Sequence, residues 1–318
     1  MDELTSWVAE LTGAREARVG ERVASLWSGY GSIVRVRLDG GPAPSVVVKR
    51  VEPPPAPTDG PSARSHARKL RSYEVERAFY ERFAGRCTDE SRVAHCYGAR
   101  ASGSRLLIAF EDLDASGFPS RRHGLGEREV GACLGWLAAF HGTFLGVVPD
   151  GLWEEGTYWH LATRPDELAR MRDGPLEAAA SALDARLRGA RHRTLVHGDA
   201  KPANFCFGSE GVAAVDFQYV GGGVGVRDVA YLLSCASPAA CAAHAERWLD
   251  VYFERLAAHA PDGVDAREVE DEWRALLPTA WADFERFLAG WAPSEHARDP
   301  FSRAMIERAL RAIAEPQD

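Results

Sequence analysis

The stretch that decides the fold is His197-Gly198-Asp199-Ala200-Lys201-Pro202-Ala203-Asn204, which is followed, after eleven intervening residues, by Asp216-Phe217-Gln218. Moving a phosphoryl group to a hydroxyl requires a carboxylate that accepts the proton and metal ions that neutralise charge on the phosphate oxygens. Asp199 can be that carboxylate, and Lys201 can reach the transferred phosphate. Asn204 and Asp216 offer oxygen ligands that suit Mg²⁺. The two segments therefore predict a magnesium-dependent phosphotransferase site.

Amino-acid composition singles out the same loop. Lysine occurs only as Lys49, Lys69 and Lys201 among the 38 basic residues, and Asn204 is the single asparagine. A chain that avoids a residue type elsewhere is expected to use it where its chemistry has no substitute. Lys201 and Asn204 therefore mark one short segment as the chemical centre.

Overall composition narrows the class of protein. The 318 residues, 46% hydrophobic and 26% charged, are typical of a globular enzyme with two lobes or domains. A net charge of -8 argues against binding nucleic acid or an anionic membrane surface. We find no apolar run long enough to span a bilayer, and residues 1–10 carry acids instead of an export signal. The six cysteines form no CxxC pair, which favours reduced thiols in the cytoplasm. We expect a monomer or homodimer.

The first third of the chain predicts a small sheet with one main helix. Val34, Val36 and Leu38 alternate with arginines after a glycine turn, and residues 45–50 form the next strand of a hairpin. The other predicted elements are a mobile surface loop at 52–65, an amphipathic helix at 73–83, and strands at 92–97 and 105–110.

After Phe110 the chain becomes polar and rich in breakers before helical periodicity takes over, so we place a boundary there. The predicted domains are 1–110 and 111–318. The second contains a helix at 127–144, a helix ending at 183–188, short strands at 194–196, 205–207 and 212–215, and mainly helices from 229 onward.

The sequence resembles a known superfamily at these motifs. D-x-K-P-x-N followed by D-F-x is similar to the catalytic and metal loops of protein-kinase-like proteins. The opening His-Gly-Asp resembles the aminoglycoside phosphotransferase and choline kinase branch, and Val215–Gln218 with Arg227–Tyr231 most resembles its ecdysteroid kinase-like group. The resemblance implies an α+β, two-lobe fold: a small N-terminal lobe with an antiparallel sheet and one main helix, and a larger, mainly helical C-terminal lobe.

The resemblance also implies roles for residues outside the motif. Lys49 would bind the α and β phosphates of ATP and pair with Glu76, with Glu74 as the alternative. The remaining implied contacts are backbone coverage of the phosphates by Gly29, Gly31 and Ser32, adenine contacts from the hinge at Glu111 and Leu113, and bracing of the catalytic loop by Asp228. The sequence departs from the family pattern at Val34, where a third glycine is expected, at Gln218, which replaces glycine, and at Ala200-Lys201, which replaces Leu-His.

The resulting hypothesis is an ATP-dependent kinase of a small hydroxylated molecule, with Asp199 as base and Mg²⁺ held by Asn204 and Asp216. The alternatives are an inactive nucleotide-binding pseudokinase and a metal-assisted hydrolase using His197, Asp199 and Asp216. A protein kinase is less favoured, since the short segment between Phe217 and Asp228 leaves no room for a long activation segment. We expect His197 to hold the loop by donating hydrogen bonds.

The acceptor and the preference for ATP over GTP are not predicted. Tryptophans and acids of the C-terminal part could form a cation site, namely Trp248, Trp273, Trp281 and Trp291 with Asp271, Glu272, Asp283 and Glu285. Their helical spacing favours packed core for most of them. Trp159 and His160 are alternative pocket residues.

Overall fold

A computed structural model describes residues 3–122, 124–172, 174–209, 211–297 and 299–315. Met1 and Asp2, at the start of the segment searched for an export signal, lie outside these ranges. The chain divides into two compact units. The first comprises Met1–Arg86, Arg92–Arg121 and Cys206–Gln218, and the second comprises Cys87–Ser91, Arg122–Phe205 and Tyr219–Asp318.

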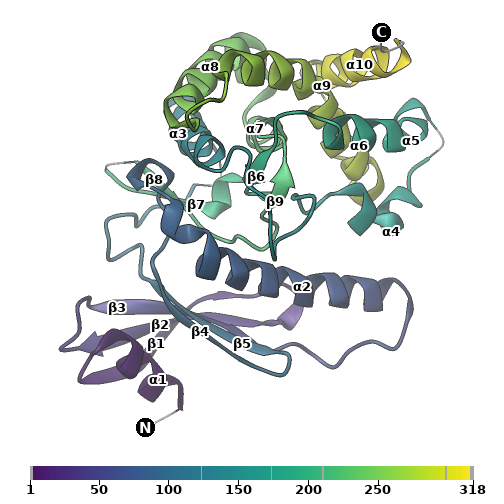
Figure 1. Ribbon diagram of the computed structural model, residues 1–318. Coiled ribbons are helices and arrows are strands. Elements are labelled where there is room, and N and C mark those ends of the chain that lie inside the picture. The colour runs from purple at the N-terminus through teal and green to yellow at the C-terminus, as the bar shows by residue number, and fades with distance from the viewer. Residues whose placement is uncertain (1–2, 123, 173, 210, 298, 316–318) are drawn as a thin grey trace. The chain divides into compact units, whose positions relative to one another are not determined.

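The first unit is built on a five-stranded antiparallel sheet in the order β1-β2-β3-β5-β4 (Figure 1). Its strands are β1 (Glu16–Ser25), β2 (Gly31–Asp39), β3 (Ser45–Val51), β4 (Cys96–Ser102) and β5 (Arg105–Glu111). The predicted hairpin is β2 and β3. The strand predicted at 92–97 was misplaced, because β4 begins at Cys96, and β1 was not predicted.

Helices cover both faces of this sheet. Against one face lies α1 (Glu3–Thr12), whose Leu4 and Val8 pack with Val36, Val46 and other strand residues. Because side chains alternate along a strand, Lys49 points to the opposite face. There its ammonium meets a side chain of α2 (Gly60–Arg82), the long helix seen above the sheet in Figure 1.

The helix α2 is longer than predicted. It begins at Gly60 with a proline in its first turn, so the second half of the loop predicted at 52–65 is helical. Proline suits this position because its missing N–H would have no partner in the first turn of a helix. The predicted helix at 73–83 is therefore only the second half of a 23-residue helix.

The second unit is mainly helical. Its helices are α3 (Glu127–Thr143), α4 (Pro165–Leu168), α5 (Pro175–Ala178), α6 (Ala180–Arg188), α7 (Val226–Ser234), α8 (Pro238–His259), α9 (Ala266–Trp291) and α10 (Pro300–Ala314). The predicted helix at 127–144 is confirmed as α3, which packs against α8 (Figure 1). β6 (Thr194–Val196) pairs with β9 (Gly221–Gly223). The motif loop, residues 197–204, follows directly after β6.

A second small sheet joins β7 (Phe205–Phe207) to β8 (Val212–Ala214), and most of it belongs to the first unit. The three strands predicted around the motif loop are thus confirmed within a residue. Short 3₁₀ turns punctuate the chain, including η1 (Trp27–Gly29) and η5 (Pro202–Asn204).

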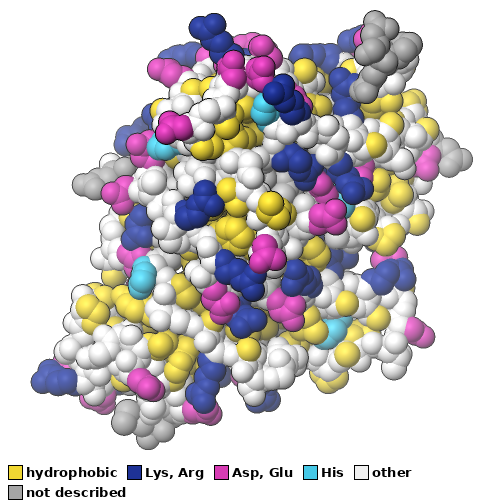
Figure 2. All heavy atoms as spheres, in the orientation of Figure 1, with side chains coloured by type: hydrophobic (Ala, Val, Ile, Leu, Met, Phe, Trp, Pro, Cys, Tyr) yellow, Lys and Arg dark blue, Asp and Glu magenta, His cyan; other side chains and the backbone are white. Residues whose placement is uncertain are grey.

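Charged side chains of both signs are interspersed over the visible face in Figure 2, and several exposed residues such as Arg15 and Asp39 form ion pairs. All six cysteines are free, in agreement with reduced thiols. Within the described ranges, every helix is too short or too polar to cross a membrane.

Candidate functional site

A buried ion pair links β3 to α2 in the first unit. Lys49 Nζ lies 2.6 Å from Glu76 Oε2 and 3.3 Å from Asp216 Oδ1. The Lys49 and Glu76 side chains are 5% and 2% exposed, whereas that of Asp216 is 36% exposed. Glu74, the alternative partner, lies on the exposed side of α2, 3.5 Å from Arg71. Three of the predicted nucleotide and metal residues therefore lie together.

The electrostatics of this cluster favour a charged lysine. Burial raises the pKa of Glu76 to about 7, against the opposing effect of Lys49, and the negative charge of Asp216 adds to the rise. Burial also acts to lower the pKa of Lys49, but the charges of Glu76 and Asp216 outweigh it and hold this pKa above its usual value. Lys49 consequently keeps its positive charge at neutral pH, as phosphate binding would require.

The segment that carries Asp216 is fixed against α2. Asp216 has φ 68°, in the left-handed region that few residues other than glycine adopt. The next residue, Phe217, is fully buried and stacks on Phe79, with ring centroids 4.1 Å apart. Ser72 Oγ donates to Gln218 Oε1 at 3.1 Å. These contacts set the position from which the Asp216 carboxylate reaches Lys49.

The glycine turn between β1 and β2 is tightly constrained. Gly31 has φ 135°, and a Cβ at this position would overlap the carbonyl oxygen of Arg50. Gly29 has φ 76°, and its N–H donates to the carbonyl of Leu26 at 3.3 Å. Ser32 pairs with residues of both neighbouring strands, so the sheet occupies its backbone. The segment that remains outside the sheet ladder is the η1 turn.

The predicted hinge is held by its own side chains. Both carboxylate oxygens of Glu111 lie 2.6 Å from Arg92 Nη2. Asp112 accepts hydrogen bonds from Arg35 Nε and Ser45 Oγ, both at 2.6 Å. Leu113 is buried, and its carbonyl accepts from the N–H of Phe118 at 2.8 Å. Because the Glu111 side chain is engaged in this way, a contact from Glu111 to adenine would use backbone atoms.

In the second unit, the loop after β6 is tied together by polar groups. Asn204 Nδ2 donates to the backbone carbonyl of Asp199 at 2.8 Å and to Asp199 Oδ2 at 3.0 Å. Lys201 Nζ lies 2.7 Å from the same Oδ2. Since Nδ2 is engaged, Oδ1 is the Asn204 atom suited to ligate a metal. The loop therefore brings Asp199, Lys201 and Asn204 together.

Buried groups behind this loop fix its backbone. The Asp228 carboxylate accepts from the N–H groups of His197 at 2.5 Å and Gly198 at 2.9 Å, and His141 Nε2 lies 3.1 Å away. The predicted bracing by Asp228 is thus confirmed. His197 also contacts the loop: its Nδ1 accepts from the Asp199 N–H at 3.2 Å, which leaves Nε2 as the ring atom for the predicted donor role.

Aromatic residues near Asp199 were missed by the sequence analysis. The Tyr158 N–H donates to the carbonyl of Gly198 at 3.0 Å, and the Tyr158 hydroxyl donates to that of Tyr231 at 3.3 Å. Burial, followed by the charge of Asp199, raises the pKa of both tyrosines. Sequence analysis suggested their neighbours, Trp159 and His160, which are both buried. Only adjacency to those residues could have pointed to Tyr158.

The C-terminal tryptophans are mostly core, as their spacing indicated. Trp248, Trp273 and Trp281 are buried, and only Trp291 is exposed, by 54%. Three of the four neighbouring acids, Glu272, Asp283 and Glu285, make structural contacts. For example, Asp283 accepts from the indole N–H of the buried Trp159 at 3.2 Å.

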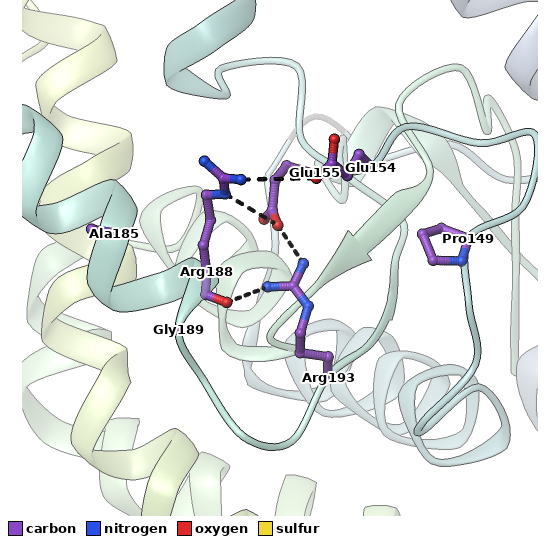
Figure 3. A pocket seen from close by; sticks show the side chains of 7 residues that line it. All are labelled: Pro149, Glu154, Glu155, Ala185, Arg188, Gly189 and Arg193. Carbon is purple, nitrogen blue, oxygen red and sulfur yellow. Dashed lines mark hydrogen bonds and ion pairs between the residues drawn. The ribbon is translucent and has the colours of Figure 1, made fainter.

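A surface hollow of about 510 Å³ lies beside the end of α6 (Figure 3). Its charged side chains point toward one another: Arg193 pairs with Glu155, and Arg188 Nε lies 3.8 Å from the same carboxylate. Glu155 also lies 3.4 Å from the fully buried Arg227, the residue before Asp228. This network supports the base of the loop that contains Asp199.

The donor set can be tested against the predicted metal. Among the residues that the structure describes, no group of three His, Cys, Asp or Glu side chains is arranged to hold an ion. Mg²⁺ is usually bound by one or two carboxylates together with substrate phosphates and water. Asp216 in the first unit and Asn204 in the second each carry an oxygen of the kind that ligates such an ion.

The sequence model of the phosphotransferase enzyme family matches residues 23–269. The chain belongs to this family. The matched range includes Lys49, Asp199, Asn204 and Asp216. No curated protein matches this phosphotransferase-family chain significantly.

Several solved structures are similar to this family member along most of its length. A choline kinase from Cryptosporidium parvum is 9% identical, with a TM-score of 0.52 over 93% of this chain and 88% of its own. An amicoumacin kinase in complex with AMP-PNP, Ca²⁺ and Ami is 14% identical, with a TM-score of 0.51 over 98% and 93%. A macrolide 2'-phosphotransferase from Brachybacterium faecium is 17% identical, with a TM-score of 0.50 over 100% and 98%. These likenesses confirm the predicted protein-kinase-like α+β fold.

Proposed function

We propose that this phosphotransferase-family protein moves the γ-phosphate of ATP to a hydroxyl group of a small molecule. The observation that carries the proposal is the buried Lys49–Glu76 pair beside Asp216. Burying a charged pair removes both ions from water, which costs stability unless geometry and further contacts offset it. A lysine kept charged beside a half-exposed carboxylate is useful for holding a metal-bound polyphosphate.

The proposed roles follow from the chemistry of each group. Lys49 binds the α and β phosphates and is oriented by Glu76. Asn204 and Asp216 hold Mg²⁺, which when bound neutralises charge on the phosphate oxygens. The turn containing Gly29 covers the phosphates, and backbone atoms of Glu111 and Leu113 contact the base. Gly29, Lys49 and Glu76 lie in the predicted lobe 1–110, whereas the predicted lobe 111–318 supplies the metal ligands, the base contacts and the acceptor site, and both lobe assignments remain predictions.

Asp199 acts on the acceptor. Its carboxylate takes the proton of the hydroxyl, the oxygen bonds to the γ-phosphorus, and the bond to the β–γ bridging oxygen breaks to release ADP. The Asn204 amide and the Lys201 ammonium both contact Asp199 Oδ2, which orients the carboxylate. Lys201 can also reach the transferred phosphoryl group and neutralise part of its negative charge.

The acceptor class is the open part of the proposal. The resemblance to the ecdysteroid kinase-like group places sterols among the candidates. The kinase likenesses of the fold add hydroxylated amines and macrolides, and the buried tryptophans give no independent support for a cation site.

The decisive experiment is a screen of hydroxylated amines, amino sugars, macrolides and sterols with Mg-ATP, in which mass spectrometry detects an added phosphate. A phosphorylated product supports the proposal. Nucleotide binding without any product would favour the pseudokinase, and release of free phosphate from a phosphoester substrate would favour the hydrolase.

A further inference from the structure

The third lysine of the chain also lies beside the proposed nucleotide site. Lys49 and Lys201 both have proposed roles with phosphate, whereas the sequence motifs left Lys69 unassigned. In a chain whose 38 basic residues include only three lysines, a lysine on α2 invites a specific explanation. Its contacts provide one.

Lys69 reaches from α2 to the η1 turn. Its Nζ donates to the backbone carbonyl of Trp27 at 3.3 Å and reaches Ser28 Oγ at 3.5 Å. The same ammonium lies 4.8 Å from the ring centroid of Tyr30, within the range of a cation–π interaction. One side chain therefore contacts three residues of the turn between β1 and β2.

The η1 turn needs outside support. Ser28 and Gly29 both have positive φ, 57° and 76°, and the left-handed conformation costs a residue with a Cβ about 1–2 kcal/mol. A short bond from the Leu26 N–H to the Gly31 carbonyl, 2.9 Å, closes the loop, but the hydrogen bonds within it are long: Gly29 N–H to Leu26 at 3.3 Å and Tyr30 N–H to Trp27 at 3.5 Å. The Trp27 side chain is 77% exposed and supplies little packing. The contacts from α2 thus compensate for weak local ones.

The contacts form one stripe of α2. His66, Lys69, Tyr73 and Glu76 follow at helical spacing, so they share a face of the helix. His66 Nδ1 lies 2.6 Å from the hydroxyl of Tyr30, and Glu76 pairs with Lys49. One helix face therefore holds both the η1 turn and the predicted phosphate-binding lysine.

We propose that Lys69 is a positioning residue of the nucleotide site, which fixes the η1 turn on α2 in the conformation that covers the nucleotide phosphates. This inference rests on the proposed function. Lysine suits the position because its compact ammonium can contact a carbonyl and a ring face together, whereas the planar guanidinium of arginine prefers bidentate partners.

The test compares Lys69→Met, Lys69→Arg and the control Arg77→Met, which removes a half-exposed cation elsewhere on α2. Calorimetry measures the affinity of each protein for Mg-ATP and for adenosine. Because the turn acts on phosphates, Lys69→Met should weaken Mg-ATP binding about tenfold, the equivalent of one strong polar contact, and leave adenosine binding unchanged. Lys69→Arg should recover part of the loss, and Arg77→Met should match the wild type.

Three results would overturn the inference. Equal weakening of ATP and adenosine would indicate a general structural role, and unchanged Mg-ATP binding would remove any role in the site. Equal losses of Mg-ATP affinity in Lys69→Met and Arg77→Met would mean that the effect comes only from the charge of the helix. Absence of Mg-ATP binding by the wild type is distinguishable from all of these, since it would refute the proposed function itself.

Discussion

Ser72 donates a hydrogen bond from its hydroxyl to the side-chain amide oxygen of Gln218 at 3.1 Å, so α2 is attached directly to the segment that carries Asp216. The same hydroxyl lies 2.8 Å from the backbone carbonyl of Lys69, so the two oxygens share its single proton as acceptors. Gln218 stands where the resemblance led us to expect glycine. The departure from the family pattern therefore has a structural consequence: the side chain adds an anchor that glycine cannot provide.

Replacing Gln218 by alanine should weaken that anchor. We expect the free energy of unfolding to fall by about 1 kcal/mol, the usual net value of one hydrogen bond, and Gln218→Gly to lose roughly 0.5–1 kcal/mol more through added backbone freedom. Urea denaturation measures both. In a double-mutant cycle with Ser72→Ala the losses should be less than additive, and strict additivity would show that the two side chains are not coupled.

The glycine turn offers a matched pair of substitutions. A Cβ at Gly31 would overlap the carbonyl oxygen of Arg50, whereas a Cβ at Gly29 meets no atom within 4 Å. Both residues have positive φ, so Gly29→Ala should cost only the conformational penalty of about 1 kcal/mol, and Gly31→Ala should cost about 3 kcal/mol or more because β3 must shift. Chemical denaturation measures the free energy of unfolding of both variants, and equal losses would contradict the predicted overlap of a Cβ at Gly31 with Arg50.

The pKa of Glu76 predicts a pH dependence of stability. Its folded-state value of about 7 lies above the usual 4.5, so the folded chain retains a proton that the unfolded chain releases between these values. The stabilisation of the folded state by this retained proton is fully present below pH 4.5 and is lost as the pH rises through about 7. Relative to Glu76→Gln, which cannot titrate, the wild type should lose on the order of 2–3 kcal/mol across this window.

Urea unfolding at pH 5, 6, 7 and 8 measures the difference in the free energy of unfolding between the wild type and Glu76→Gln. Glu74→Gln is the matched control, because it removes an exposed carboxylate of the same helix and keeps Glu76, so its stability should fall with pH as that of the wild type does. Parallel stability curves for wild type and Glu76→Gln would mean that Glu76 does not retain its proton in the folded state.

Much of the fold could be predicted because its signals are local. In β2, Val34 and Val36 alternate with arginines, β3 carries the consecutive valines 46–48, and α3 is rich in apolar residues, so all three were found at nearly their true bounds. The strand β1 was missed because it is an edge strand whose residues are mostly exposed and whose apolar and polar side chains do not alternate regularly. The start of α2 was missed because Pro61 and the small polar residues around it resemble a loop, although proline is well suited to a first helical turn.

From spacing alone the site was predictable only where its residues are close in sequence, whereas the pairing of Lys49 with Glu76 was expected from the family resemblance. Asp199, Lys201 and Asn204 contact one another across five residues, and their spacing alone indicated the loop. By contrast, the contact between Lys69 and Trp27 joins residues 42 positions apart. That contact and the one between Tyr158 and Gly198 depend on how separate elements pack, about which a single sequence contains no information.

Asp216→Asn tests the proposed metal ligand. Asparagine tolerates the positive φ of this position, so the backbone should persist while the anionic ligand is lost. We expect Mg-ATP affinity to fall about 10-fold to 100-fold, as for a lost metal ligand contact, and magnesium-free ATP to bind at least as well because a negative charge has been removed. Calorimetry with and without magnesium measures both values. Asp39→Asn, an exposed control, should change neither, and an unaltered magnesium dependence in Asp216→Asn would remove Asp216 from the metal site.

Asp199→Ala tests the proposed base. The substitution removes the carboxylate that accepts the proton of the acceptor and leaves Lys49, Glu76 and Asp216 in place. Mg-ATP binding should therefore be kept, whereas phosphoryl transfer should fall by about 10²–10⁴-fold. Asp199→Asn should be similarly inactive, because an amide can accept the hydrogen bond of Asn204 but cannot take up a proton.

The measurement is single-turnover transfer to whichever acceptor the screen identifies, with the nucleotide saturating so that binding does not limit the rate. Asp250→Asn, an exposed control that pairs with Arg274, should retain full activity. Transfer by Asp199→Ala at the wild-type rate would assign the base to another group. A rate that recovers with rising pH would show instead that the hydroxyl can ionise without help, which leaves Asp199 only an orienting role.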